Sequence, residues 1–216
     1  MINILSKENS LCSQFIAELR DVTIQQDRMR FRRNMERLGE IFAYEISKKM
    51  VFENREVTTP LGIAQVAVIE NQPVVASILR AGLPLHNGIT NYFDKADNSF
   101  VSAYRIHHKD GGFDIKIEYL SSPTLTNRIL ILCDPMLATG TSMVLAYKAL
   151  LEKGKPAHTH IVSTLASKDG INYIKSHLSA HDITLWVGAV DEELTAQSFI
   201  VPGLGDAGDL SFGGKN

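Results

Sequence analysis

A short polar loop directly after a buried strand is the part of the sequence best suited to chemistry. The apolar run Ile129–Cys133 is followed by Asp134, and the small residues 138–142 then lead into a helical pattern. Ligands of open α/β sheets lie beyond the carboxyl ends of the strands. Successive backbone N–H groups in such a loop bind an anion, and the start of a helix adds partial positive charge. The spacing therefore predicts a phosphate site with Asp134 beside it.

The residue types within the loop fit a phosphate monoester. Thr139, Thr141 and Ser142 offer hydroxyl donors. Gly140 lets the backbone come close to the ligand, and Asp134 would accept hydrogen bonds from sugar hydroxyls. The alternative is an ordinary helix start, at which Thr141 or Ser142 caps the first turn. A nucleoside-triphosphate P-loop fits less well, because the Gly-Lys-Ser/Thr ending is missing.

The elements that would position this loop alternate between strands and helices. Continuous apolar runs, which are typical of strands buried on both faces, span residues 73–79, 99–106, 128–133, 160–166 and 183–190. Helical patterns lie between them, at residues 83–93, 141–153 and 170–178. Because this alternation implies right-handed crossovers, we expect an α/β fold with a mostly parallel sheet flanked by helices.

The segments outside this alternation carry other patterns. The first fifty residues are predicted to be helical, with one apolar stripe formed by Met35, Leu38, Phe42 and Ile46. Residues 55–69 are expected to form a β-hairpin with its turn at residues 60–62. Residues 106–120 are expected to form a second hairpin or a flexible hood.

Composition limits the class of protein. The chain has 216 residues, 44% of them hydrophobic and 21% charged, which suits one globular α/β domain. A net charge of −2 and a pI of about 6.4 give no field that would attract nucleic acid or an anionic membrane. Cys12 and Cys133 lie far apart and form no metal-type pair. With no leader pattern and no long apolar run, we expect a cytoplasmic protein with neither nucleic acid nor membrane as a partner.

Three stretches resemble a known family. "LCDPMLATGTS" (132–142) is similar to the phosphoribosyl-diphosphate (PRPP) motif of the type I phosphoribosyltransferases, and it resembles their uracil phosphoribosyltransferase branch most. "SILRAGLPLHNGI" (77–89) is similar to the diphosphate-binding loop of that branch. "FIVPGLGDAGDLSFGGK" (199–215) is similar to its uracil-binding tail. The resemblance covers about residues 28–216, with departures at Pro84, Asn87, Thr141 and residues 106–114.

The resemblance implies a fold and an activity. The fold would be that of the type I phosphoribosyltransferases, in a single domain of residues 1–216. Its parts would be N-terminal helices with a hairpin arm (1–72), a PRPP-binding core (73–191) and a base-binding tail (192–216) that is expected to form a loop. The implied reaction is pyrimidine salvage, in which uracil and PRPP give uridine monophosphate (UMP) and diphosphate. The implied cofactor is Mg²⁺, held through PRPP and water without a firmly assigned protein ligand.

The resemblance also assigns roles to residues. It implies catalytic roles for Arg80, Asp134 and Asp206. The implied PRPP-binding residues are Arg80, Arg105, Asp134, Pro135, Met136, Leu137, Ala138, Thr139, Gly140, Thr141, Ser142 and Asp206. The implied uracil-binding residues are Ile200, Gly205, Asp206 and Ala207. Backbone groups of a glycine-rich tail can match the O2, N3–H and O4 edge of uracil, and such pairing can discriminate against cytosine by about 10⁴ or more.

Five arginines crowd the start of one predicted helix, which is unfavourable against the helix dipole. They are Arg28, Arg30, Arg32, Arg33 and Arg37. A solvated basic face is the interpretation favoured by the pattern itself. The resemblance implies a subunit contact or a GTP effector site instead, and a homo-oligomer, either a dimer or a tetramer.

Two alternative functions stay open. The first is an enzyme that accepts another nucleobase, such as a purine, and the base-binding tail argues against it. The second is a regulator that keeps the fold but binds RNA. The pI of about 6.4 and the joint presence of Arg80, Arg105 and Asp134 argue against that alternative.

Overall fold

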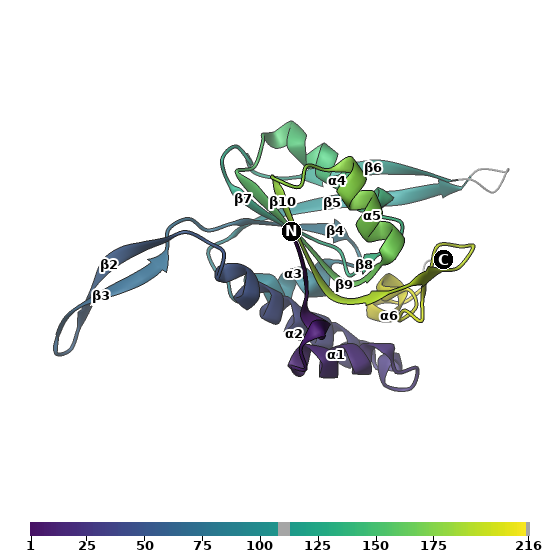
Figure 1. Cartoon of the computed structure of the whole chain (residues 1–216), viewed down its shortest axis with the longest axis horizontal. Coiled ribbons are helices and arrows are strands. Elements are labelled where there is room, and N and C mark those ends of the chain that lie inside the picture. Colours follow the sequence, from purple (N-terminus) through teal and green to yellow (C-terminus); the bar gives the residue numbers. More distant parts are fainter. Residues whose placement is uncertain (108–112, 215–216) are drawn as a thin grey trace.

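A mostly parallel sheet forms the centre of the computed structural model (Figure 1), which describes residues 1–107 and 113–214, with only the backbone described for 103–107 and 113–116. The sheet strands are β1 (Ile2–Ile4), β4 (Val74–Leu79), β5 (Asp97–His107), β6 (Phe113–Ser121), β7 (Ile129–Cys133), β8 (Met136–Leu137), β9 (His158–Ser167) and β10 (Ile183–Asp191). Their order is β1-β10-β9-β7-β4-β5-β6, and β8 also pairs with β9. Every pair is parallel except β5 with β6. The expected α/β fold is therefore confirmed.

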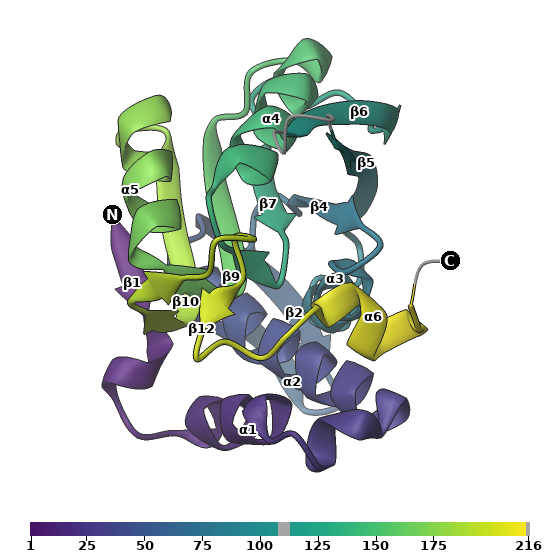
Figure 2. The same cartoon turned by 90° about the vertical axis from the view of Figure 1, so that its right-hand side faces the viewer.

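Helices cover both faces of this sheet (Figure 2). The helices are α1 (Leu11–Arg20), α2 (Arg28–Ser47), α3 (Leu83–Thr90), α4 (Thr141–Leu150), α5 (Lys168–His177) and α6 (Ala207–Phe212). Helices α1, α2 and α3 share one apolar core with one face of the sheet, and α4 and α5 share a second core with the other face. In β7, Ile131 and Cys133 belong to the first core, whereas Leu130 and Leu132 belong to the second. This alternation explains why the strand is apolar throughout.

The predicted apolar stripe of α2 is confirmed. Met35, Leu38, Phe42 and Ile46 are all at most 1% exposed. They lie at three- and four-residue steps, so they form one face of a helix, and that face packs into the first core. Among the described residues, every helix is too short or too polar to cross a membrane.

The first predicted hairpin is also confirmed, and it projects from the body as an arm (Figure 1). Strands β2 (Phe52–Thr59) and β3 (Gly62–Ile69) pair with each other and form a separate two-stranded sheet. Thr59 Oγ1 closes the turn by accepting from the Leu61 N–H at 3.2 Å. The second predicted hairpin corresponds to the antiparallel strands β5 and β6. Its expected tip, residues 108–112, lies outside the described residues.

Two expectations were wrong. The first fifty residues are not all helical, because residues 2–4 form β1, which pairs in parallel with β10. Three residues are too few to display a period, and each pairs with a residue of β10 that lies 183 positions further along the chain. The tail is not only a loop, because it contains the ribbon β11 (Glu193–Leu194) and β12 (Ile200–Val201), followed by helix α6.

Three of the arginines at the start of α2, Arg28, Arg30 and Arg33, are exposed, and the other two are half-buried. Asp27 caps the helix by accepting from the N–H groups of the next turn, and most of the arginines have protein partners. These contacts are Arg30 with Glu18, Arg33 with Glu36 and Glu40, Arg37 with Asn34, and Arg32 with the Ser211 carbonyl. Nearby carboxylates and this cap offset the unfavourable dipole interaction that the sequence suggests.

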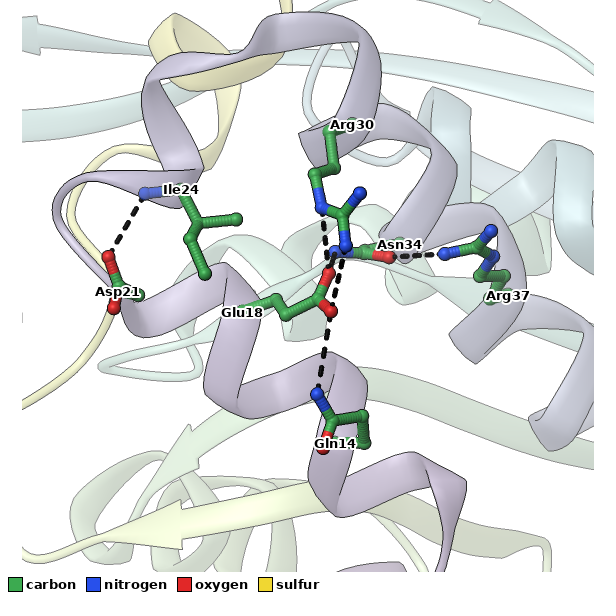
Figure 3. Close-up of polar contacts among 7 residues, drawn as sticks. All are labelled: Gln14, Glu18, Asp21, Ile24, Arg30, Asn34 and Arg37. Carbon is green, nitrogen blue, oxygen red and sulfur yellow. Dashed lines mark hydrogen bonds and ion pairs between the residues drawn. The ribbon is translucent and has the colours of Figure 1, made fainter.

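Glu18 joins α1 to α2 at the centre of this network (Figure 3). Its carboxylate accepts from Arg30 Nε and Nη2, both at 3.0 Å, and from Asn34 Nδ2 at 2.7 Å. These hydrogen bonds lower the pKa of Glu18 to about 2, and the one from Arg30 has the larger effect, followed by the one from Asn34. Because the folded-state pKa lies below the unfolded value, the network stabilises the fold above pH 4.5 and loses that effect as the pH falls toward 2.

Replacing Glu18 with glutamine should therefore destabilise the protein in a pH-dependent way. At pH 7 we expect the free energy of unfolding to fall by about 1 kcal/mol, because the network is partly open to solvent. Between pH 4.5 and pH 2 the difference from wild type should shrink, because the wild-type carboxylate also becomes neutral there. Urea unfolding at pH 7 and pH 3 measures both values. An equal difference at the two pH values would show that charge does not carry the effect.

Candidate active site

Two loops with predicted site residues meet at the carboxyl ends of neighbouring strands. Arg80 directly follows β4, and Asp134 directly follows β7, with which β4 pairs in parallel. The loops are in close contact at Gly82, where an added Cβ would lie 2.9 Å from the Cys133 carbonyl oxygen and 2.5 Å from Ser77 Oγ. Only glycine fits between them. The structure therefore brings the diphosphate-loop and PRPP motifs to one edge of the sheet.

Strand β9 fixes the main chain at Asp134. The Asp134 N–H donates to the Val162 carbonyl at 3.1 Å, and the Asp134 carbonyl accepts from Ser163 Oγ at 2.6 Å. The neighbouring Cys133 is fully buried, and burial raises the pKa of its thiol far above the usual range. Cys133 is thus a neutral packing residue.

The loop 138–142 starts a helix without a side-chain cap. Helix α4 begins at Thr141, and the residue before it is Gly140, at φ +81°. Gly140 stands at the cap position and has no side chain to cap the helix, so the alternative in which Thr141 or Ser142 is the cap is wrong. Thr139 Oγ1 accepts from the Thr141 N–H at 3.4 Å and lies 3.2 Å from the hydroxyl of Thr141. The other N–H groups of the first turn are suited to an anion.

Helix α5 and the serine that precedes it contact the loop 138–142. Ser167 caps α5 by accepting from the Gly170 N–H at 2.8 Å, and its hydroxyl donates to the Ala138 carbonyl at 2.5 Å. An added Cβ on Gly140 would lie 3.0 Å from the Gly170 carbonyl and 3.1 Å from Tyr173. The fold itself therefore requires glycine at position 140, in addition to any close approach of a ligand. The short strand β8 lies directly before the loop, within the PRPP motif, and pairs with β9.

The tail places the predicted base-binding residues against the first core. Ile200 and Ala207 are 5% and 3% exposed and pack into that core. Gly205 has a φ of +93°, which favours glycine. Asp206 caps α6, and its Oδ1 accepts from the Asp209 N–H at 2.9 Å. The four residues lie within one short segment that crosses the end of the sheet (Figure 2).

Arg80 connects this tail to the sheet edge. Its Nη2 donates to Asp209 Oδ1 at 2.7 Å and to the Gly213 carbonyl at 2.6 Å. Its Nε is buried and has no hydrogen-bond partner among the residues that the structure describes. An added Cβ on Gly208 would lie 3.7 Å from that Nε. One guanidinium thus contacts the tail and still has hydrogen-bonding capacity at the site.

One predicted residue is placed only through its backbone. Arg105 lies in β5, next to β4, and its side chain lies outside the described residues. Sequence reasoning missed four supporting residues, Ser163, Ser167, Asp209 and Gly170. The Ser167 cap could have been predicted from the sequence, because a serine just before a helical pattern frequently caps the helix. Among the described residues, no group of three or more His, Cys, Asp or Glu side chains could hold a metal ion.

Comparisons with known proteins agree on one family. The family model described as uracil phosphoribosyltransferase matches residues 6–214. A curated uracil phosphoribosyltransferase from Porphyromonas gingivalis is 56% identical over 211 residues, which cover 98% of this chain and 97% of the relative. A uracil phosphoribosyltransferase from Methanothermobacter thermautotrophicus is 37% identical over 185 residues, which cover 85% and 83%.

A solved structure supports the same fold. The AQ2163 protein from Aquifex aeolicus matches with a TM-score of 0.86 at 29% identity, and the match covers 99% of this chain and 98% of that protein. The family model spans all three motifs that the structure brings to one sheet edge. On the strength of that match and of the 56% identical relative, the chain belongs to the uracil phosphoribosyltransferase family.

Proposed function

We propose that this enzyme transfers the phosphoribosyl group of PRPP to uracil in pyrimidine salvage, giving UMP and diphosphate. The observation that carries the proposal is the meeting of three motifs at the carboxyl edge of the sheet. They are the loop after β4, the loop between β7 and α4, and the tail that Arg80 holds against that edge. The family match supports the choice of substrates.

In the proposed reaction, uracil N1 forms a bond to the anomeric carbon of PRPP as the bond from that carbon to the diphosphate oxygen breaks. The electron pair of the broken bond leaves with diphosphate, and the N1 proton of uracil passes to solvent water. Positive charge develops on the ribose and negative charge on the leaving group. Positioning and electrostatic stabilisation are therefore the main tasks of the protein.

Each motif has a task in this reaction. The uncapped start of α4, with loop 138–142, would hold the 5′-phosphate of PRPP. Asp134 would accept hydrogen bonds from the ribose hydroxyls. Arg80 would bind the diphosphate through its guanidinium, and Arg105 is proposed as a second cation there. Pro135, Met136 and Leu137 would set the path of the chain between Asp134 and the phosphate loop.

Mg²⁺ is the proposed cofactor. The ion is proposed to be held mainly by PRPP oxygens and water, because Mg²⁺ usually keeps several waters and binds through substrate phosphates. The chemistry that Mg²⁺ supplies when it is bound is neutralisation of charge on the leaving diphosphate. No protein ligand is assigned to it.

The base-reading segment, residues 200–207, is proposed to recognise uracil through main-chain groups near Ile200 and Gly205–Ala207. Ile200 and Ala207 are buried, Gly205 has no side chain, and the Asp206 carboxylate caps α6, so the main chain is the principal hydrogen-bonding surface for a base. Cytosine lacks the N3–H and carries a donor in place of O4. It would leave buried main-chain groups unpaired, which is a strong source of discrimination. Asp206 would act on PRPP or on the N1 proton rather than on base choice.

An assay with several bases tests this proposal. With PRPP and Mg²⁺, the wild-type protein should release diphosphate and form UMP from uracil. The ratio kcat/KM should be lower for cytosine by about 10⁴ or more, and hypoxanthine should give no nucleotide. Chromatography of the products, run beside a diphosphate assay, identifies what forms. Equal efficiency on cytosine would refute backbone pairing, and activity only on hypoxanthine would identify a purine enzyme.

We further propose a homo-oligomer, either a dimer or a tetramer, in which the β2–β3 arm contacts a second copy. The arm carries exposed apolar side chains, including Leu61 at 100%, Ile63 at 70% and Phe52 at 47%. A two-stranded ribbon is marginally stable alone, and contiguous exposed apolar residues mark interaction sites. Light scattering of the wild type and of an Ile63→Lys variant tests the contact.

A GTP effector site and a cytoplasmic location also stay proposals. A cavity of about 590 Å³ lies between α2 and α6, and it supports the effector site. Its lining residues include Arg28, Arg32 and Gln26. Measuring the KM for PRPP with and without GTP tests the effector role.

A further inference from the structure

An ion pair outside the three motifs holds the base-reading segment. Arg20, the last residue of α1, and Asp191, the last residue of β10, form a two-pronged contact with N–O distances of 2.8 and 2.7 Å. Asp191 is 7% exposed and Arg20 24% exposed at the side chain. Both charges are thus largely withdrawn from water, where paired geometry matters most.

The same pair holds the main chain of Gly203 on both sides. Arg20 Nη1 donates to the Gly203 carbonyl at 2.9 Å, and the Gly203 N–H donates to Asp191 Oδ2 at 3.0 Å. Gly203 has a φ of +59°, and an added Cβ would lie 2.1 Å from the Ile200 carbonyl. The peptide is therefore fixed in one conformation by one carboxylate and one guanidinium.

The contact between Asp191 and Gly203 joins the two ends of the segment that contains β11 and β12. The β11–β12 ribbon leaves the sheet just after Asp191 and ends just before Gly203. The next residues, Leu204 to Ala207, belong to the base-reading segment. Fixing Gly203 therefore fixes where that segment starts to cross the site. The ends of α1 and β10 determine this position.

We propose that Arg20 and Asp191 are positioning residues for uracil recognition. This inference rests on the proposed function. Main-chain groups read a base only when they are held within a fraction of an ångström, and a small displacement lowers the rate steeply. The PRPP-binding loop has separate supports in β9 and α5, through Ser163 and Ser167. The segment adds only Asp206 to the proposed PRPP site, so loss of the ion pair should damage uracil use much more than PRPP binding.

Two variants test the proposal, with a third as a matched control. Asp191→Asn keeps the size of the side chain but removes its charge, and Arg20→Lys keeps the charge but loses the two-pronged geometry. Asp97→Asn removes the partner of Arg128, whose ion pair of 2.9 Å lies at the opposite ends of the strands. The measurements are kcat, the KM for uracil, uracil-to-cytosine selectivity, and PRPP affinity by calorimetry.

We expect Asp191→Asn to raise the KM for uracil about tenfold or more while PRPP affinity stays within about twofold. Arg20→Lys should show the same split to a smaller degree, and Asp97→Asn should behave as wild type. Unchanged KM and selectivity in folded Arg20→Lys and Asp191→Asn would overturn the proposal, and so would equal losses for uracil and PRPP. If Asp191→Asn does not fold, the same criteria apply to Arg20→Lys. A wild-type protein that made no UMP would refute the proposed function instead.

Discussion

Replacing Arg80 with alanine is expected to lower kcat about 10²- to 10³-fold, because the guanidinium is assigned to the departing diphosphate. Removing a charge that acts mainly in the transition state lowers kcat more than it weakens substrate binding. The affinity for uracil should change less than kcat. Steady-state kinetics at saturating PRPP, with calorimetry of each substrate, measure both effects.

A control separates this role from general charge loss. Arg128 has a similarly exposed side chain and an ion pair of similar length with Asp97, far from the site edge. Arg128→Ala should leave kcat unchanged. Wild-type turnover in folded Arg80→Ala would show that Arg80 is misassigned. A lysine at position 80 should restore part of the rate, because it returns the charge but not the planar fork.

Ala207→Leu is expected to abolish measurable use of uracil while PRPP binding persists. Ala207 is 3% exposed and starts α6 within the proposed base-reading segment, so three added carbon atoms have no free space there. The overpacking should also cost about 1–3 kcal/mol of stability. Calorimetric titration with PRPP and with uracil, together with thermal unfolding, separates the two effects.

The control for Ala207→Leu is a second alanine-to-leucine substitution, which adds the same side-chain volume outside the proposed site. Ala64 lies in the β2–β3 arm, outside the body of the sheet. Ala64→Leu should therefore leave uracil kinetics unchanged. Normal uracil kinetics in Ala207→Leu would contradict the proposed base-reading segment and would move the base site elsewhere.

The buried strands were predictable because the burial of each strand is visible in its own run of residues. A strand packed on both faces needs apolar residues at every position, and the run Ile129–Cys133 has them. Strand β1 was missed because an edge strand of three residues has no period to detect. Helix α6 was missed because Pro202 and the nearby glycines suggested a loop, although Asp206 is a good cap residue.

The loops of the site were predictable, but their supports were not. A loop after a parallel strand lies at the carboxyl edge, so Asp134 and Arg80 could be placed from the sequence. The contact between Arg80 and Asp209 joins residues 129 positions apart, and that between Arg20 and Asp191 joins residues 171 apart. No local pattern encodes such pairs, because they depend on how separate elements pack.

Strand β9 lies in the interior of the sheet and supports only one half of the site, so the two halves should differ in local stability. Hydrogen bonds pair β9 with β7 on one side and with β10 on the other, and its serines hold Asp134 and the phosphate loop. Core strands open only through nearly global unfolding, whereas peripheral segments open locally. Amide hydrogens of β9 should therefore exchange among the slowest in the protein. The tail packs on the first core but adds no strand to the main sheet, so its amide hydrogens should exchange faster. The phosphate half of the site should therefore be the more rigid half before any substrate arrives, and the base half should fluctuate more.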